Sequence, residues 1–232
     1  MHTLKEINTS AYDTCANFKQ SRFKSISDHQ LFKYRMMMGV VYYLILGISA
    51  KANETNPWAF WYYESSWGML ASTISLTLTI LAADHKLCQR IAVIIFELAT
   101  CMDVIIFPVF NILLAPMIFP NMPHSTGIEK LFYARMFLIH FVPGVFTFLN
   151  LYLSDVSFPK QDIYHIAMFC VMYGWANSTG VMYQNSMIEP GFTFLPASSQ
   201  WFGVLFTFLQ AIVQCLIFHL LAVKTAEHRR DK

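Results

Sequence analysis

Six long apolar runs, separated by short polar or charged stretches, dominate the pattern of this chain. They cover residues 36–50, 65–83, 91–119, 136–154, 163–188 and 201–223. Runs near 20 residues match the thickness of a lipid bilayer, whereas the cores of soluble proteins rarely repeat such lengths. These runs lack the alternation of barrel strands, so only helices would satisfy their backbone in lipid. The pattern predicts an all-α, polytopic transmembrane bundle with six spans.

The polar ends set the predicted domain division. Residues 1–35 form a polar arm, residues 36–223 form the transmembrane domain, and residues 224–232 form a basic tail. Within the arm, apolar residues recur at helical spacing, which favours a surface-lying helix or a partner-binding arm. A loosely ordered polar terminus is the alternative. The apolar residues concerned are Leu4, Ile7, Ala11, Cys15 and Phe18.

Basic residues flank the spans unevenly. If there are six spans, all but three of the 16 Lys and Arg residues lie on the side that holds both termini. The exceptions are Lys51, Lys130 and Arg135. The positive-inside rule therefore predicts both ends in the cytosol, or in the matrix of a mitochondrion.

The amino-acid composition also distinguishes a membrane protein from a soluble one. Only 13% of the residues are charged, whereas soluble domains carry about 25%. Aromatic residues make up 16%, which suits a lipid-facing surface and its interfaces. The net charge of +2 gives no reason to expect nucleic acid as a partner. The five cysteines are an odd number without a CxxC motif and indicate core residues, so we expect no metal and no cofactor.

Polar residues inside the runs are the candidate functional residues, because burying them in lipid is costly and they usually face the bundle interior. Gln210 and Gln214 are four residues apart and should share one face of a helix. Glu97 and Asp103 would serve as proton-relay groups, or stay neutral or paired near the inner face. The intramembrane polar candidates are Glu97, Asp103, Asn111, Asn150, Asn177 and Gln210.

Depth along each run separates these groups. Counted from the outer end at about 1.5 Å per residue, Thr73 lies roughly 10 Å deep and His140 roughly 12 Å deep. Asp103 lies roughly 24 Å from the outer end of its own run. Thr73 and His140 could therefore meet, whereas Asp103 is too deep to orient His140. A hydroxyl beside His140 would be a nucleophile with its general base, and the alternative is a hydroxyl that only packs between helices.

Three stretches of the chain carry a family likeness. They are residues 67–73, residues 106–110 leading to Phe119 and Pro120, and the segment from His140 through Pro143, Asn150, Phe158, Pro159, Tyr173 and Asn177 to 189–192. In these stretches the chain resembles the androgen-induced-gene family of six-span membrane proteins and their rolling-stone relatives.

This resemblance implies a six-helix bundle with a lipid-accessible cavity. It also implies hydrolysis of fatty acid esters of hydroxy fatty acids by an intramembrane Thr and His. His140 matches the family's His. The family's Thr, four residues after a Trp, is replaced here by Ala71, so Ser72 or Thr73 would have to act as the nucleophile.

Three functions follow from these observations. The first is a non-catalytic accessory subunit of a larger membrane complex, for which a mitochondrial inner-membrane respiratory assembly is one candidate. Its partners would be membrane lipids and other membrane subunits, and the endoplasmic reticulum or plasma membrane is the alternative location. The second is a lipid ester hydrolase with His140 and Ser72 or Thr73. The third, a transporter with a path through Glu97, Asp103, Asn111 and Gln210, lacks the inverted repeat that many transporters carry.

Overall fold

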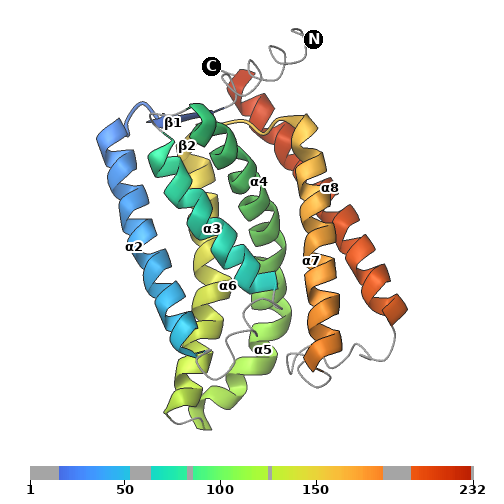
Figure 1. The fold of residues 1–232 in the computed structure, drawn as a ribbon. Helices are drawn as coiled ribbons and strands as arrows, with labels where there is room; N and C mark the ends of the chain where they lie inside the picture. Colours follow the sequence, from blue (N-terminus) through green and yellow to red (C-terminus); the bar gives the residue numbers. More distant parts are fainter. Residues whose placement is uncertain (1–15, 53–63, 83–85, 125–126, 185–199, 231–232) are drawn as a thin grey trace.

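The computed structural model describes residues 16–52, 64–82, 86–124, 127–184 and 200–230, which form an up-and-down bundle of helices (Figure 1). Each predicted apolar run contains most of one long helix, and the run 91–119 continues past its helix through a π turn and α5 (Ala115–Ile118). The long helices are α2 (Asp28–Ala52), α3 (Glu64–Leu81), α4 (Lys86–Val109), α6 (Ile128–Leu153), α7 (Ile163–Gln184) and α8 (Gln200–Arg230). The predicted helical fold is therefore confirmed in its main feature.

Four helical segments among the described residues are long and apolar enough to cross a membrane. They are Asp28–Lys51, Cys88–Ile118, Lys130–Leu153 and Phe208–Glu227. The chain is thus consistent with a multi-pass membrane protein. The number of six spans stays a prediction.

The helices pack in two groups. Helices α2 and α4 both pack on α3 and α6, α3 also contacts α6, and α7 packs along α8 beside α4 (Figure 1). Helix α4 is central, because 61% of its apolar window is buried, against 28% for α2 and 22% for α8. One apolar cluster, which includes Phe96, Ile166 and Phe218, joins α4 to α7 and α8. A second, which includes Met38, Met69 and Ile139, joins α2, α3 and α6.

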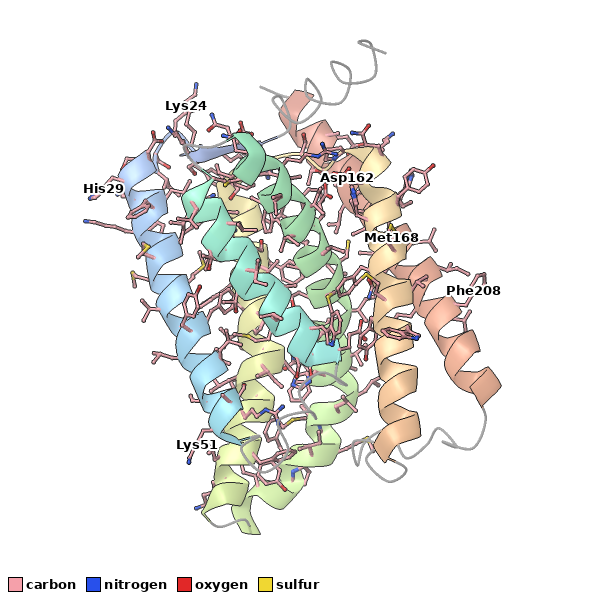
Figure 2. All side chains as sticks on the ribbon, viewed as in Figure 1. Lys24, His29, Lys51, Asp162, Met168 and Phe208 are labelled. Carbon is pink, nitrogen blue, oxygen red and sulfur yellow. The ribbon has the colours of Figure 1, made fainter. Side chains whose placement is uncertain are left out.

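Besides its apolar core, the bundle exposes many large apolar side chains and buries many polar ones. Large apolar side chains are exposed along the outer helices, and Figure 2 shows Met168 of α7 and Phe208 of α8 on this surface. In contrast, the buried face of α3 is rich in hydroxyls: Ser65, Ser66, Ser72, Thr73, Ser75 and Thr79. Because exposed apolar surface is stable against hydrocarbon and not against water, this distribution fits a lipid environment.

Helix α4 continues beyond Val109 through a π-helical turn. Pro108 lies inside α4, and the π-helix η2 (Phe110–Leu114) leads into α5 (Ala115–Ile118) and the 3-10 helix η3 (Phe119–His124). Proline removes a backbone donor, and π-helix occurs mostly as a single turn within an α-helix. The side-chain amide Nδ2 of Asn111 donates to the carbonyl of Phe107 at 2.7 Å. This bond satisfies one of the carbonyls at the turn.

Two short strands correct the all-α prediction. Strand β1 (Ala16–Ser21) pairs antiparallel with β2 (Ser154–Val156), with Ala16 opposite Val156 and Asn17 opposite Asp155. Phe18 lies in β1, so the predicted helical arm is wrong at that residue, because backbone pairing with β2 outweighs the local spacing. The arm's other apolar residues, Leu4 to Cys15, lie outside the described part.

The polar segments meet at one end of the bundle. Strand β1 pairs with the connection between α6 and α7, which includes β2 and the 3-10 helix η4 (Lys160–Asp162). The backbone N–H of Phe158 donates to Thr225 Oγ1 of α8 at 3.0 Å. Helix α2 begins at Asp28 and α8 continues to Arg230, so helix extends into both predicted polar ends. Figure 2 shows Lys24 at this end and Lys51 at the opposite end.

Close helix packing depends on Gly144, and its replacement by Ala tests this. A Cβ at Gly144 would lie 2.6–2.8 Å from the ring and Cβ of Phe107, so α6 and α4 would have to separate. We expect Gly144→Ala to lower stability by about 1–3 kcal/mol, measured by thermal unfolding in detergent. Gly47→Ala is the control, because a Cβ there meets nothing within 4 Å. Equal stability of the two variants would contradict the proposed tight contact.

Candidate functional site

A buried polar cluster lies at the centre of the four-helix group. Each helix contributes one side chain: Tyr42 from α2, Ser72 from α3, Asp103 from α4 and Thr147 from α6. The Ser72 hydroxyl donates to Asp103 Oδ2 at 2.8 Å, and Thr147 Oγ1 donates to Ser72 Oγ at 3.4 Å. The Tyr42 hydroxyl lies 3.4 Å from Thr147 Oγ1 and donates to the carbonyl of Pro143 at 3.3 Å. The hydroxyls of Thr147 and Ser72 therefore form a chain that ends on the carboxyl group of Asp103, with the Tyr42 hydroxyl beside it.

This geometry corrects the predicted depth of Asp103. The sequence places Asp103 well below Ser72, yet the two side chains share a hydrogen bond. The error comes from counting depth from the end of the run at Phe119. Figure 1 shows that the segment 110–118, with its π turn and α5, extends past the start of α3. Asp103 consequently lies at the level of the α3 hydroxyls.

A small cavity of about 10 Å³ adjoins the central cluster. Tyr42, Ser72 and Thr147 line it from the cluster, and Ser75 and Asn150 line it as well. This volume is close to that of one water-sized sphere. The cavity is therefore far smaller than a site for a lipid or a metabolite.

A second polar cluster surrounds Arg35, which is only 3% exposed. Its Nε donates to Asn150 Oδ1 at 3.0 Å, and its Nη2 donates to Ser154 Oγ at 2.7 Å. Its Nη1 donates to the carbonyl of Phe18 in β1, and the guanidinium lies 5.9 Å from the centre of the Phe18 ring. Arg35 thus ties α2 to the end of α6 and to strand β1. Asn150, a predicted intramembrane polar residue, takes its place in this cluster.

Arg35 was not among the sequence candidates, although a signal exists. The buried positions of α2 recur every three or four residues: Leu31, Arg35, Met38, Tyr42, Ile45 and Ser49. The position of Arg35 on this stripe indicates an interior residue. Its position beside an apolar run indicates only a flanking charge, which is how the sequence prediction treated it.

A third polar cluster connects α3 to the α7–α8 pair. Gln210 and Gln214 of α8 both donate through Nε2 to Oε1 of Glu64, at 2.5 and 3.0 Å. The Cys170 thiol of α7 donates to Gln214 Oε1 at 3.2 Å. The prediction that Gln210 and Gln214 share a face is confirmed. Glu64 was missed because it lies just before the apolar run of α3.

The predicted catalytic residues are hydrogen-bonded to other groups. Thr73 donates to the carbonyl of Met69 in its own helix at 2.8 Å. His140 Nδ1 lies 2.6 Å from the carbonyl of Met136, and its ring stacks on Phe110 at 4.0 Å with an interplanar angle of 9°. Since a carbonyl only accepts, Nδ1 carries the hydrogen and Nε2 is the acceptor. Within the described residues, no hydrogen bond joins His140 to Ser72 or to Thr73.

The remaining candidates are separated. Glu97 is fully buried on α4. Asn111 binds the carbonyl of Phe107, and Gln210 binds Glu64, so neither is hydrogen-bonded to Asp103. Asn177 belongs to α7, and its side chain lies outside the described part. In the described residues, no group of three or more His, Cys, Asp or Glu is arranged to hold a metal ion.

A shallow apolar groove of about 370 Å³ follows α8 on the outer surface. Its lining comes almost wholly from α8, with Ile163 at the start of α7. The α8 residues are Phe208, Ala211, Ile212, Cys215, Leu216 and His219. The groove is separate from both Ser72 and His140, neither of which lines it.

Comparison of the chain with protein-family models, curated proteins and solved structures finds no match. The resemblance to the androgen-induced-gene family therefore stays a prediction.

The Arg35 cluster gives a testable consequence for stability. Arg35→Met would remove the hydrogen bonds that Arg35 donates to Asn150, Ser154 and the Phe18 carbonyl, so we expect a loss of roughly 2–3 kcal/mol. Because the guanidinium also holds β1, trypsin should cleave more quickly after Lys24. Lys33→Met, an exposed position on the same helix, is the control and should change neither measurement. Cleavage at the wild-type rate in Arg35→Met would refute the anchoring role.

Proposed function

We propose that this chain is a six-span integral membrane protein that acts as a non-catalytic subunit of a larger membrane assembly. Six helices of 18 to 31 residues alternate in direction, which supports six spans. Many polar side chains are buried between these helices and many large apolar side chains are exposed on them, which supports a lipid or protein environment around the bundle.

The observation that carries this proposal is the engagement of the Ser72 hydroxyl by Asp103. A hydrolase needs a nucleophile next to its base and a cavity for the substrate. Ser72 instead donates to a carboxyl group on a neighbouring helix, beside a cavity of only about 10 Å³. Ligand sites usually measure about 300–1,000 Å³. The arrangement supports a role in holding helices together.

The exposed apolar faces of α2 and α8 favour lipids and other membrane subunits as binding partners. Both helices bury less than a third of their apolar windows, 28% for α2 and 22% for α8, and large apolar side chains are exposed on them. Met37 and Leu44 lie on α2, and Leu216 and Leu220 lie on α8. Other membrane subunits and lipids are the partners that such faces accept, since neither carries a charge in these stretches.

The lipid ester hydrolase is the second candidate, and one observation favours it. The Nδ1–H tautomer of His140 leaves Nε2 as a proton acceptor, which is the state that a general base requires. A hydrolase would need a movement that brings His140 from Phe110 to a hydroxyl of α3. The experiment below includes this candidate as an outcome.

The proposal also includes the orientation of the chain and the membrane in which it lies. We place the basic end, with Lys24 and Lys224, in the cytosol or in the mitochondrial matrix, because positive loops stay on that side. The mitochondrial inner membrane is our proposed location, and the endoplasmic reticulum and plasma membrane are the alternatives that cell fractionation would reveal.

Six spans predict a simple pattern of surface labelling. Single cysteines introduced at Lys24 and Lys224 should react with a membrane-impermeant maleimide from one side. Cysteines introduced at Lys51 and Lys130 should react from the other, because all four positions are exposed near helix ends. The unmodified chain measures the background from its native cysteines. Labelling of Lys24→Cys and Lys224→Cys from opposite sides would exclude an even number of spans.

The subunit role predicts behaviour in native membranes. After extraction in a mild detergent, the chain should migrate on a native gel in an assembly larger than the purified chain, and the purified chain should unfold at a lower temperature. Incubated with a fatty acid ester of a hydroxy fatty acid, the purified chain should show the same turnover as Ser72→Ala, Thr73→Ala and His140→Ala variants. Turnover that depends on His140 would establish the hydrolase instead.

A further inference from the structure

The cavity beside the central cluster contains a buried hydroxyl that the helices leave without a partner. Ser75 is 2% exposed, and its Oγ has no hydrogen-bond partner within the described residues. Ser75 lines the same cavity of about 10 Å³ as Tyr42, Ser72, Thr147 and Asn150. An unsatisfied buried hydroxyl is costly, so such a group usually marks a bound water or ion.

Polar groups from α3 itself and from two other helices face this cavity together with Ser75. Hydroxyls come from Tyr42 of α2, Ser72 of α3 and Thr147 of α6, and Asn150 of α6 adds an amide. A buried water needs about 10–15 Å³ and two to four polar partners. Both conditions are met here.

The charges around the cavity favour water over a cation. Asn150 Oδ1 already accepts from Arg35 Nε at 3.0 Å and from Ser154 Oγ at 3.2 Å. The Nδ2 group of Asn150 remains as a donor, and the other end of the same amide is bound by the guanidinium of Arg35. The carboxyl group of Asp103 already accepts from Ser72. A ligand that both donates and accepts, and carries no charge, fits this environment.

We propose that this cavity binds a single water molecule that joins the Asp103 cluster to the Arg35 cluster. Ser72, Thr147 and Tyr42 belong to the first cluster and Asn150 belongs to the second, and all four line the cavity. The water accepts from the Asn150 amide and hydrogen-bonds with the Ser75 hydroxyl. One network then runs from Asp103 in the middle of the bundle to Arg35 at its basic end, across α2, α3, α4 and α6.

Whether Ser75→Ala lowers or raises the midpoint of thermal unfolding tests this site. With water bound, Ser75→Ala removes a partner of that water and should lower the midpoint of thermal unfolding by about 2–4 °C in lipid nanodiscs. Without water, the same change removes an unsatisfied hydroxyl and should raise the midpoint. Ser66→Ala is the matched control, because Ser66 is a buried, unpartnered hydroxyl of the same helix that does not line the cavity. It should leave the midpoint unchanged or raise it.

Two measurements complete the test. The midpoint should be equal in sodium chloride and in choline chloride of the same concentration. If sodium stabilised the protein and Ser75→Ala abolished this effect, the cavity would bind a cation and not water. A cryo-electron microscopy map of the reconstituted protein should show density within hydrogen-bond distance of Ser75 Oγ and the Asn150 amide. A midpoint for Ser75→Ala at or above wild type, or an empty cavity in a map that resolves other waters, would overturn the proposal.

Discussion

The hydrogen bonds that converge on Asp103 are the interaction on which the four-helix group depends. In hydrocarbon, lipid offers no partner to a polar side chain, so each polar group must find one inside the protein. Asp103 on the central helix α4 accepts from Ser72 of α3, which accepts in turn from Thr147 of α6, with Tyr42 of α2 beside it. Four helices are thereby fixed at one level, and their apolar clusters pack around this point.

The same principle explains how peripheral helices stay attached. Helix α2 buries little of its apolar window, yet Tyr42 anchors it near the middle and Arg35 anchors it at one end. Helix α8 buries even less, and Gln210 and Gln214 hold it to Glu64 of α3. Because neighbouring lipid competes for apolar contacts but not for these polar bonds, a few buried groups specify which face of each helix turns inward.

The sequence predicts what depends on composition and local spacing, and it fails where contacts join distant residues. The apolar runs identify the helices, and a spacing of four places Gln210 and Gln214 on one face. Arg35 bonds to a residue 115 positions away, which no local pattern reveals. Phe18 follows a helical spacing but joins a strand that forms only when β2 is present. Asp103 was placed too deep because the π turn after Pro108 carries the rest of its run beyond the bundle.

The burial of the polar groups also limits which of them can reach a substrate. A side chain that is hydrogen-bonded between helices and sealed from solvent stabilises the fold but cannot meet a substrate without opening the bundle. Ser72 and Asp103 are in this condition, and His140 is stacked on Phe110 away from both. The described part of the chain also presents an apolar outer surface and a basic end. A subunit uses such surfaces directly, because its partners bind to the outside of the bundle while the polar interior keeps the helices in register.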